Sequence, residues 1–73
     1  MTEDTYQIQV QGWISKRWAS WFDGMTIAYE EINGSPVTTL TGAVADQAAL
    51  RGILNRIWDL NLMLISVYPV EKR

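Results

Sequence analysis

Cysteine and histidine are both absent from this chain of 73 residues. Without cysteine no disulfide can form, and without either residue the chain lacks the ligands that zinc and most transition metals prefer. The same absences exclude Ser/His/Asp and Cys/His catalytic sets, in which a histidine activates the nucleophile. No Gly-x-Gly-x-x-Gly run or phosphate-binding loop occurs either. We therefore expect no metal site, no cofactor and no catalytic residue of these classes.

Basic stripes and long apolar runs are lacking as well. Six basic residues face eight acidic ones, which gives a formal net charge of −2. The basic residues are scattered along the chain, so no nucleic-acid partner is expected. No apolar run approaches the roughly 20 residues of a membrane span, and the polar start from Met1 to Asp4 is unlike a signal peptide. The expected location is the cytoplasm, without a membrane partner.

The short length predicts one domain with a small interior. We expect a single domain over residues 1–73, with residues 1–4 disordered. Domains of this size gain stability from disulfides, from metals or from association. Because the first two are not expected, we expect a homo-oligomer, with a dimer as its simplest form.

Two hydrophobic periods alternate along the chain. Alternation of apolar and polar residues, or a short apolar run, predicts four strands, over 5–11, 25–32, 37–41 and 62–68. Apolar residues spaced three and four apart predict two helices, over 15–22 and 47–60. Asn33-Gly34 is a strong signal for a two-residue hairpin turn, because both residues tolerate positive φ.

The second helix is the stronger of the two. Its apolar residues form a continuous stripe, and Asp46 is placed to cap its first turn. Gly52 inside it costs about 1 kcal/mol relative to alanine. Such a glycine usually marks the close approach of another backbone, and we expect one here.

The first helix is short, with two turns at most. Ser15 can cap it, and Trp18, Trp21 and Phe22 fall on one face. Two turns are marginal in isolation. Either these aromatic residues hold a helix against the sheet, or residues 15–22 form an aromatic loop.

This order of elements indicates an α+β sandwich, in which an antiparallel four-stranded sheet carries two helices on one face. The order is similar to that of the ferredoxin-like βαββαβ unit. The expected core comprises Tyr6, Ile8, Val10, Trp18, Phe22, Ile27, Leu40, Leu50, Ile53, Leu54, Ile57 and two or three residues of the last strand. The opposite face is expected to expose Gln7, Gln9, Thr26 and Thr39. Because the last strand looks apolar on both faces, we expect an oligomer interface at Gln7, Gln9 and Ile65.

The one unusual feature of the sequence is a cluster of aromatic residues. Four of them crowd one segment near Lys16 and Arg17: Trp13, Trp18, Trp21 and Phe22. Trp58 lies on the flank of the second helix, beside Arg51 and Asn55. Large side chains in so small a protein can be core, or they can form a surface that stacks on a ligand or partner. If they bind, the candidate site residues are Arg17, Trp18, Trp21, Asp23 and Trp58, and an exposed Trp13 or Trp58 would favour this alternative.

No pair of carboxylates is arranged for acid–base chemistry. Glu30 and Glu31 are neighbours on a predicted strand and point to opposite faces. Asp23 precedes a glycine at the exit of the first helix, which is typical of a turn, and Asp46 is placed as a cap.

Four motifs carry a resemblance to a known group of proteins. They are Arg-Trp-x-x-Trp-Phe-Asp-Gly at 17–24, Thr-x-Leu-x-Gly at 38–42, Asp-Gln-Ala-Ala-Leu-x-Gly-Ile-Leu at 46–54 and Asp-Leu-x-Leu-x-Leu-Ile-Ser-Val at 59–67. With these motifs, residues 12–67 resemble a group of small uncharacterised bacterial proteins of about this length. The resemblance implies a common architecture and no assigned activity. Similar proteins often carry histidine where this chain has Arg51, so the resemblance implies no catalytic role for that position.

Two functions are consistent with these observations. The first is a small non-enzymatic binding or assembly module that forms a homo-oligomer. The alternative is a small cofactor-free enzyme, because monooxygenases and muconolactone-isomerase-like enzymes without cofactors look similar in element order. It would use Arg17, Tyr29 and Asp23 around an aromatic pocket of about 300 Å³ or more. No small-molecule ligand can be named for either function.

Overall fold

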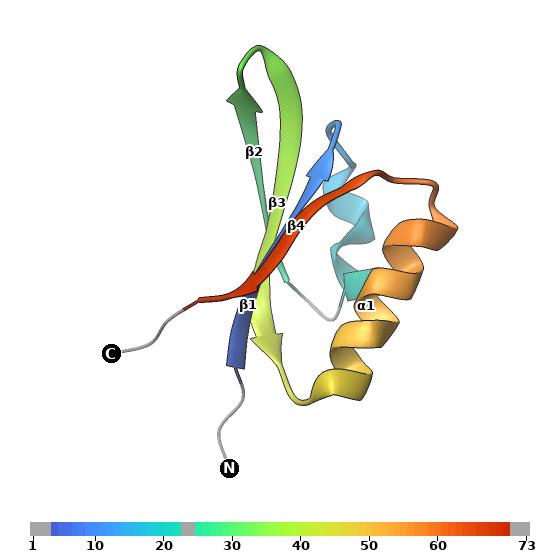
Figure 1. Cartoon of the computed structure of the whole chain (residues 1–73). Helices are drawn as coiled ribbons and strands as arrows, with labels where there is room; N and C mark the ends of the chain where they lie inside the picture. The colour runs from blue at the N-terminus through green and yellow to red at the C-terminus, as the bar shows by residue number, and fades with distance from the viewer. Residues whose placement is uncertain (1–3, 23–24, 71–73) are drawn as a thin grey trace.

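The computed structural model describes residues 4–22 and 25–70, without the side chains of residues 19–21. The elements of this part, in chain order, are β1 (Asp4–Gln11), η1 (Lys16–Phe22), β2 (Thr26–Ile32), β3 (Ser35–Val44), α1 (Gln47–Asp59) and β4 (Leu64–Pro69) (Figure 1). Asp4, which was expected in a disordered start, begins β1 and pairs with Val44. The other residues of that expected start, 1–3, lie outside the described residues.

The strands form one antiparallel sheet in the order β2-β3-β1-β4. β3 pairs with all of β1 and extends to Val44, three residues beyond the predicted end. The register between β1 and β4 shifts between Gln9 and Val10. The turn between β2 and β3 consists of Asn33 and Gly34, whose φ angles are 53° and 80°. The predicted two-residue hairpin is therefore confirmed.

The helix α1 begins where the sequence predicts. The carboxylate of Asp46 accepts a hydrogen bond from the backbone N–H of Ala49 at 2.8 Å, so the predicted cap is confirmed. Leu50, Ile53 and Ile57 form its buried stripe. Asn61, with a φ of 64°, follows the last turn and lets the chain leave the helix toward β4.

The expected ferredoxin-like sandwich with two helices on one face is wrong, because residues 15–22 do not form an α-helix. η1 is a 3₁₀ helix, and α1 is the only α-helix in the described part of the chain. The first turn of η1 is closed by the Trp18 N–H, which donates to the Ser15 carbonyl at 3.1 Å, an i to i+3 bond. The Ser15 hydroxyl accepts from the Arg17 N–H at 3.2 Å, which matches the cap expected at Ser15.

Packing against the sheet explains this geometry better than helix propensity does. Phe22 is fully buried and Trp18 packs at the edge of the core, so η1 is held at two points four residues apart. A segment of two turns has too few internal bonds to impose an α-helix on these anchors. The tighter 3₁₀ form, with a rise of about 2.0 Å per residue, serves as a connector between other elements.

One face of the sheet packs against α1 and η1. The buried apolar residues are Ile8, Val10, Ile14, Phe22, Met25, Val37, Leu40, Val44, Leu50, Ile53 and Ile57. Four residues expected in this core, Tyr6, Trp18, Ile27 and Leu54, are partly buried against it, as are Leu64 and Val67 of β4. The core therefore follows the predicted stripe and alternation. Its additions, such as Ile14 and Met25, flank η1, where the sequence has no clear period.

Two glycines differ in their surroundings. A Cβ at Gly52 would meet no atom within 4 Å, so the close backbone neighbour expected there is wrong. A Cβ at Gly42 on β3 would lie 2.8 Å from Cγ of Met25. Gly42 is thus the position where close packing requires the missing side chain.

Candidate functional site

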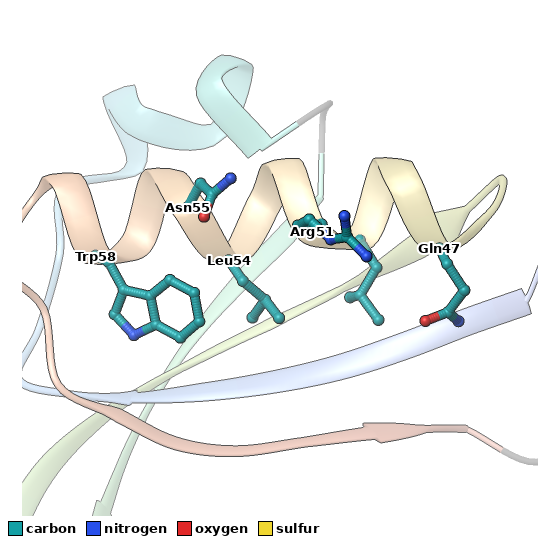
Figure 2. A pocket seen from close by; sticks show the side chains of 6 residues that line it. Gln47, Arg51, Leu54, Asn55 and Trp58 are labelled. Carbon is teal, nitrogen blue, oxygen red and sulfur yellow. The ribbon is translucent and has the colours of Figure 1, made fainter.

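A groove of about 380 Å³ runs along α1. The residues that line it are Gln47, Leu50, Arg51, Leu54, Asn55 and Trp58. Figure 2 shows Gln47, Leu54 and Trp58 extending from the side of the helix that faces β1 and β4, with η1 on its other side. We call this surface the α1 groove.

Helical periodicity places these residues together. Gln47, Arg51, Leu54 and Trp58 lie at positions i, i+4, i+7 and i+11, which form one stripe along a helix. This stripe lies directly beside the buried stripe of α1. Leu50 belongs to the buried stripe and also lines the groove. The sequence prediction that Trp58 stands on the helix flank beside Arg51 and Asn55 is confirmed.

The α1 groove has an apolar floor and polar walls. Leu50 is buried and Leu54 is partly buried, so both present carbon at the base. The amide of Gln47 donates to the Tyr6 hydroxyl at 3.4 Å, which links this end of α1 to β1. Trp58 at the other end is 53% exposed, an unusual state for so large an apolar ring.

A second aromatic surface is formed by Tyr29 of β2 and Trp13, which follows the end of β1. The rings of Trp13 and Tyr29 meet edge to face, with centroids 6.4 Å apart, and border an apolar hollow of about 270 Å³. The Lys16 ammonium stands 6.0 Å from the centre of the Tyr29 ring. The Trp13 indole donates to the Glu30 carbonyl at 3.3 Å, and the Tyr29 hydroxyl donates to the Ile14 carbonyl. Both polar groups are thus used within the molecule, and the two rings brace each other.

Of the five site residues predicted from the sequence, the three whose side chains the structure describes do not line one pocket. Trp58 lines the α1 groove, whereas Trp18 packs against the core, and the exposed Arg17 does not line the groove. The side chain of Trp21 and all of Asp23 lie outside the described residues. The alternative enzyme needed Arg17 and Tyr29 beside one pocket, and neither lines the α1 groove.

Of the lining residues only Trp58 was predicted as a site residue, and Arg51 and Asn55 were named only as its neighbours. Gln47, Leu50 and Leu54 were not connected with a site at all. Helical spacing could have grouped Gln47 and Leu54 with Trp58, because the three residues lie on one stripe of the helix, next to the apolar stripe. Leu50 and Leu54 were instead assigned wholly to the core. The sequence does not show that this flank of α1 remains uncovered by the strands.

The outer face of the sheet carries the residues predicted for association. Gln7 and Gln9 alternate with the buried Ile8 and Val10, so they lie on the face opposite α1. The Gln9 side chain accepts from the Ser66 hydroxyl at 3.0 Å and donates to the Thr39 hydroxyl at 3.4 Å.

Two more side chains, those of Tyr68 and Thr39, extend this outer face, and Ile65 lies at the irregularity of β4. The Tyr68 hydroxyl donates to the Gln7 side chain at 2.7 Å. Thr39, which was expected to be exposed, is covered, and its hydroxyl donates to the Glu30 carboxylate at 3.1 Å. Ile65 is 49% exposed and lies where the register between β1 and β4 shifts.

Comparison with known proteins places the chain in a family. A family model described as a domain of unknown function, DUF8691, matches residues 5–68. The chain belongs to this family. No curated protein and no solved structure matches it.

The described residues contain neither a membrane-spanning helix nor a cluster of metal ligands. No helix there is both long and apolar enough to cross a bilayer. No group of three or more acidic, cysteine or histidine side chains lies close enough there to hold a metal ion.

Proposed function

We propose that this domain is a non-enzymatic binding module that recognises a partner protein through the α1 groove. The observation that carries the proposal is Trp58, a tryptophan 53% exposed at one end of an open groove with an apolar floor. Tryptophan is enriched among the residues that dominate binding energy, because its ring buries a large area with few rotatable bonds.

The chemistry of the groove supports binding over catalysis. General acid–base catalysis uses His, Asp, Glu, Lys, Tyr or Cys. None of these types is among the described residues that line the groove. Its polar side chains are amides, one guanidinium and one indole, which orient a ligand by hydrogen bonds.

Selection of short random peptides displayed on phage, with the full chain as target, tests this function. We expect enriched peptides to bind the wild-type chain and to lose at least about tenfold in affinity for Trp58→Ala, as for the removal of a hot-spot residue. Trp13→Ala is the matched control, because Trp13 is even more exposed, at 60%, and lies outside the groove. Enriched peptides that bind Trp58→Ala as tightly as the wild type would contradict the proposal.

The proposal includes association of like subunits through the outer face of the sheet. In Figure 1 α1 lies on one side of the sheet, and no described element covers the other side. Gln7, Gln9 and the exposed Ile65 provide polar and apolar contacts there. Sedimentation should give a mass near twice 8.3 kDa for the wild type and near 8.3 kDa for a folded Ile65→Glu variant. A wild-type chain that sediments as a monomer, or an Ile65→Glu variant that stays associated, would refute this interface.

A further inference from the structure

Two polar groups of the α1 groove, those of Arg51 and Trp58, are hydrogen-bond donors for which the described residues provide no acceptor. Within the described residues, neither the Arg51 guanidinium nor the Trp58 indole N–H has a hydrogen-bond or ion-pair partner. Arginine offers five N–H donors and no acceptor, and the indole N–H is a donor only. These groups therefore match a ligand that brings oxygen acceptors.

The charge of the groove also favours a ligand with oxygen acceptors. Arg51 is the one charged side chain among the described lining residues, and no carboxylate there neutralises it. A guanidinium binds a carboxylate in a bidentate manner, with charge-assisted bonds that are stronger than neutral ones. An anionic group on the ligand is therefore complementary to this end of the groove.

Helix geometry gives the spacing between the two donors. Arg51 and Trp58 are seven residues apart on α1, which corresponds to about 10.5 Å along the helix axis at about 1.5 Å per residue. An extended peptide covers this length in about three residues, at about 3.3 Å per residue. A small anion can contact only one of these two donors, whereas an extended segment can reach both.

We infer that the partner contributes an extended segment in which a carboxylate and a bulky apolar side chain are about three residues apart. The carboxylate pairs with Arg51, and the apolar side chain packs on Leu54 against the Trp58 ring. A backbone carbonyl of the segment accepts the indole N–H. This inference rests on the proposed function, because it names the partner class for the same groove.

Paired synthetic peptides measure the contribution of the carboxylate. One peptide carries Glu three residues before Leu in a Gly/Ser background, and its match carries Gln in place of Glu. A second pair has the reverse order, since the groove does not fix the direction of the chain. In one of the two pairs, at low salt, we expect the Glu peptide to bind the wild-type chain about fivefold more tightly than its Gln match, as for one exposed ion pair. About 0.5 M salt should reduce this preference, because it screens charges at the surface.

Two arginine variants test which charge is responsible. Arg51→Gln should remove the preference for Glu, so that the Glu and Gln peptides of a pair bind this variant equally. Arg17→Gln is the matched control, because it changes the net charge equally at an exposed arginine outside the groove, and it should keep the preference. Since Arg51 is exposed and has no partner in the described residues, its replacement should not unfold the protein. Urea denaturation of each variant checks this.

The outcomes separate this inference from the function on which it rests. If the Glu and Gln peptides bind equally and both depend on Trp58, the carboxylate is not recognised and the inference is overturned, while the groove remains a binding site. Retention of the Glu preference by Arg51→Gln overturns the inference too. If no peptide binding depends on Trp58, the proposed function falls and the inference with it.

Discussion

The side chain of Thr38 should contribute more to stability than its size suggests. Thr38 is fully buried on β3, and its hydroxyl donates to the Gly12 carbonyl at 2.6 Å and accepts from the Ile14 N–H at 3.1 Å. These two bonds attach the segment after β1, which carries Trp13, to the sheet. Thr38→Val keeps the shape of the side chain but removes both bonds.

The expected loss follows from the two backbone groups left behind. A buried polar group without a partner costs about 1–3 kcal/mol. Ile14 is 8% exposed, so its N–H incurs most of this cost, whereas the half-buried Gly12 carbonyl can regain water in part. We expect Thr38→Val to lower the free energy of unfolding by about 2–4 kcal/mol. At roughly 0.1 kcal/mol per residue, that is about a quarter to a half of the total for a domain of this length.

Urea denaturation with matched variants measures this loss. Thr39→Val is the best control, because Thr39 is the next residue and is 2% exposed, and among the described residues its hydroxyl bonds only to the side chains of Glu30 and Gln9. Those side chains can turn to water, so we expect a loss of at most about 1 kcal/mol. Thr38→Ser, which keeps the hydroxyl and loses a methyl group, should also cost about 1 kcal/mol. A Thr38→Val variant no less stable than Thr39→Val would refute the reasoning.

Three further predictions concern packing and exposure. Gly52→Ala should raise the free energy of unfolding by about 0.5–1 kcal/mol in urea denaturation, because a Cβ there meets no atom and lowers the entropy of the unfolded chain. Gly42→Ala should lower it by about 1–3 kcal/mol, because its Cβ would lie 2.8 Å from Cγ of Met25; equal stability would show that this contact relaxes freely. Iodide should quench the fluorescence of the wild type, and Trp13→Phe and Trp58→Phe should each lose a quenchable fraction, whereas unchanged quenching in both would mean that neither ring is exposed.

Local signals predicted the elements that depend on local chemistry. Asn33-Gly34 fixed the hairpin because positive φ is required at both positions, and Asp46 marked the start of α1 because its carboxylate satisfies an orphan N–H. The stripe of Leu50, Ile53 and Ile57 predicted the buried face of α1. These features involve residues within a few positions of one another, so a single sequence contains them.

The errors lie where long-range packing decides. The spacing of Trp18 and Phe22 fits an α-helix, but the core holds both residues in a 3₁₀ segment. Thr39 alternates as an exposed residue, yet side chains of neighbouring strands cover it. Gly52 indicated a close neighbour that does not exist, because a glycine is also tolerated on an exposed helix face at a modest cost.

The candidate site was predicted in part. Trp58, Arg51 and Asn55 were placed on one flank of the helix by periodicity alone, and they line one groove. The aromatic residues of η1 were grouped with Trp58 because all are large aromatic side chains, but the fold directs Trp18 to the core. Trp13, which follows β1, pairs with Tyr29 on β2, and no local sequence pattern indicates this contact.

The indole N–H signal of Trp58 tests the central claim, that the α1 groove is the surface on which a partner binds. In proton–nitrogen NMR spectra of the full chain, Trp58→Phe and Trp13→Phe assign the two relevant indole signals. When the Glu–Leu peptide that binds more tightly is added, the Trp58 indole signal should move downfield as it gains an acceptor, while the Trp13 signal, already bonded to the Glu30 carbonyl, stays in place. A stationary Trp58 signal together with shifts at Trp13, or along Gln7 and Gln9, would place binding elsewhere and contradict the account.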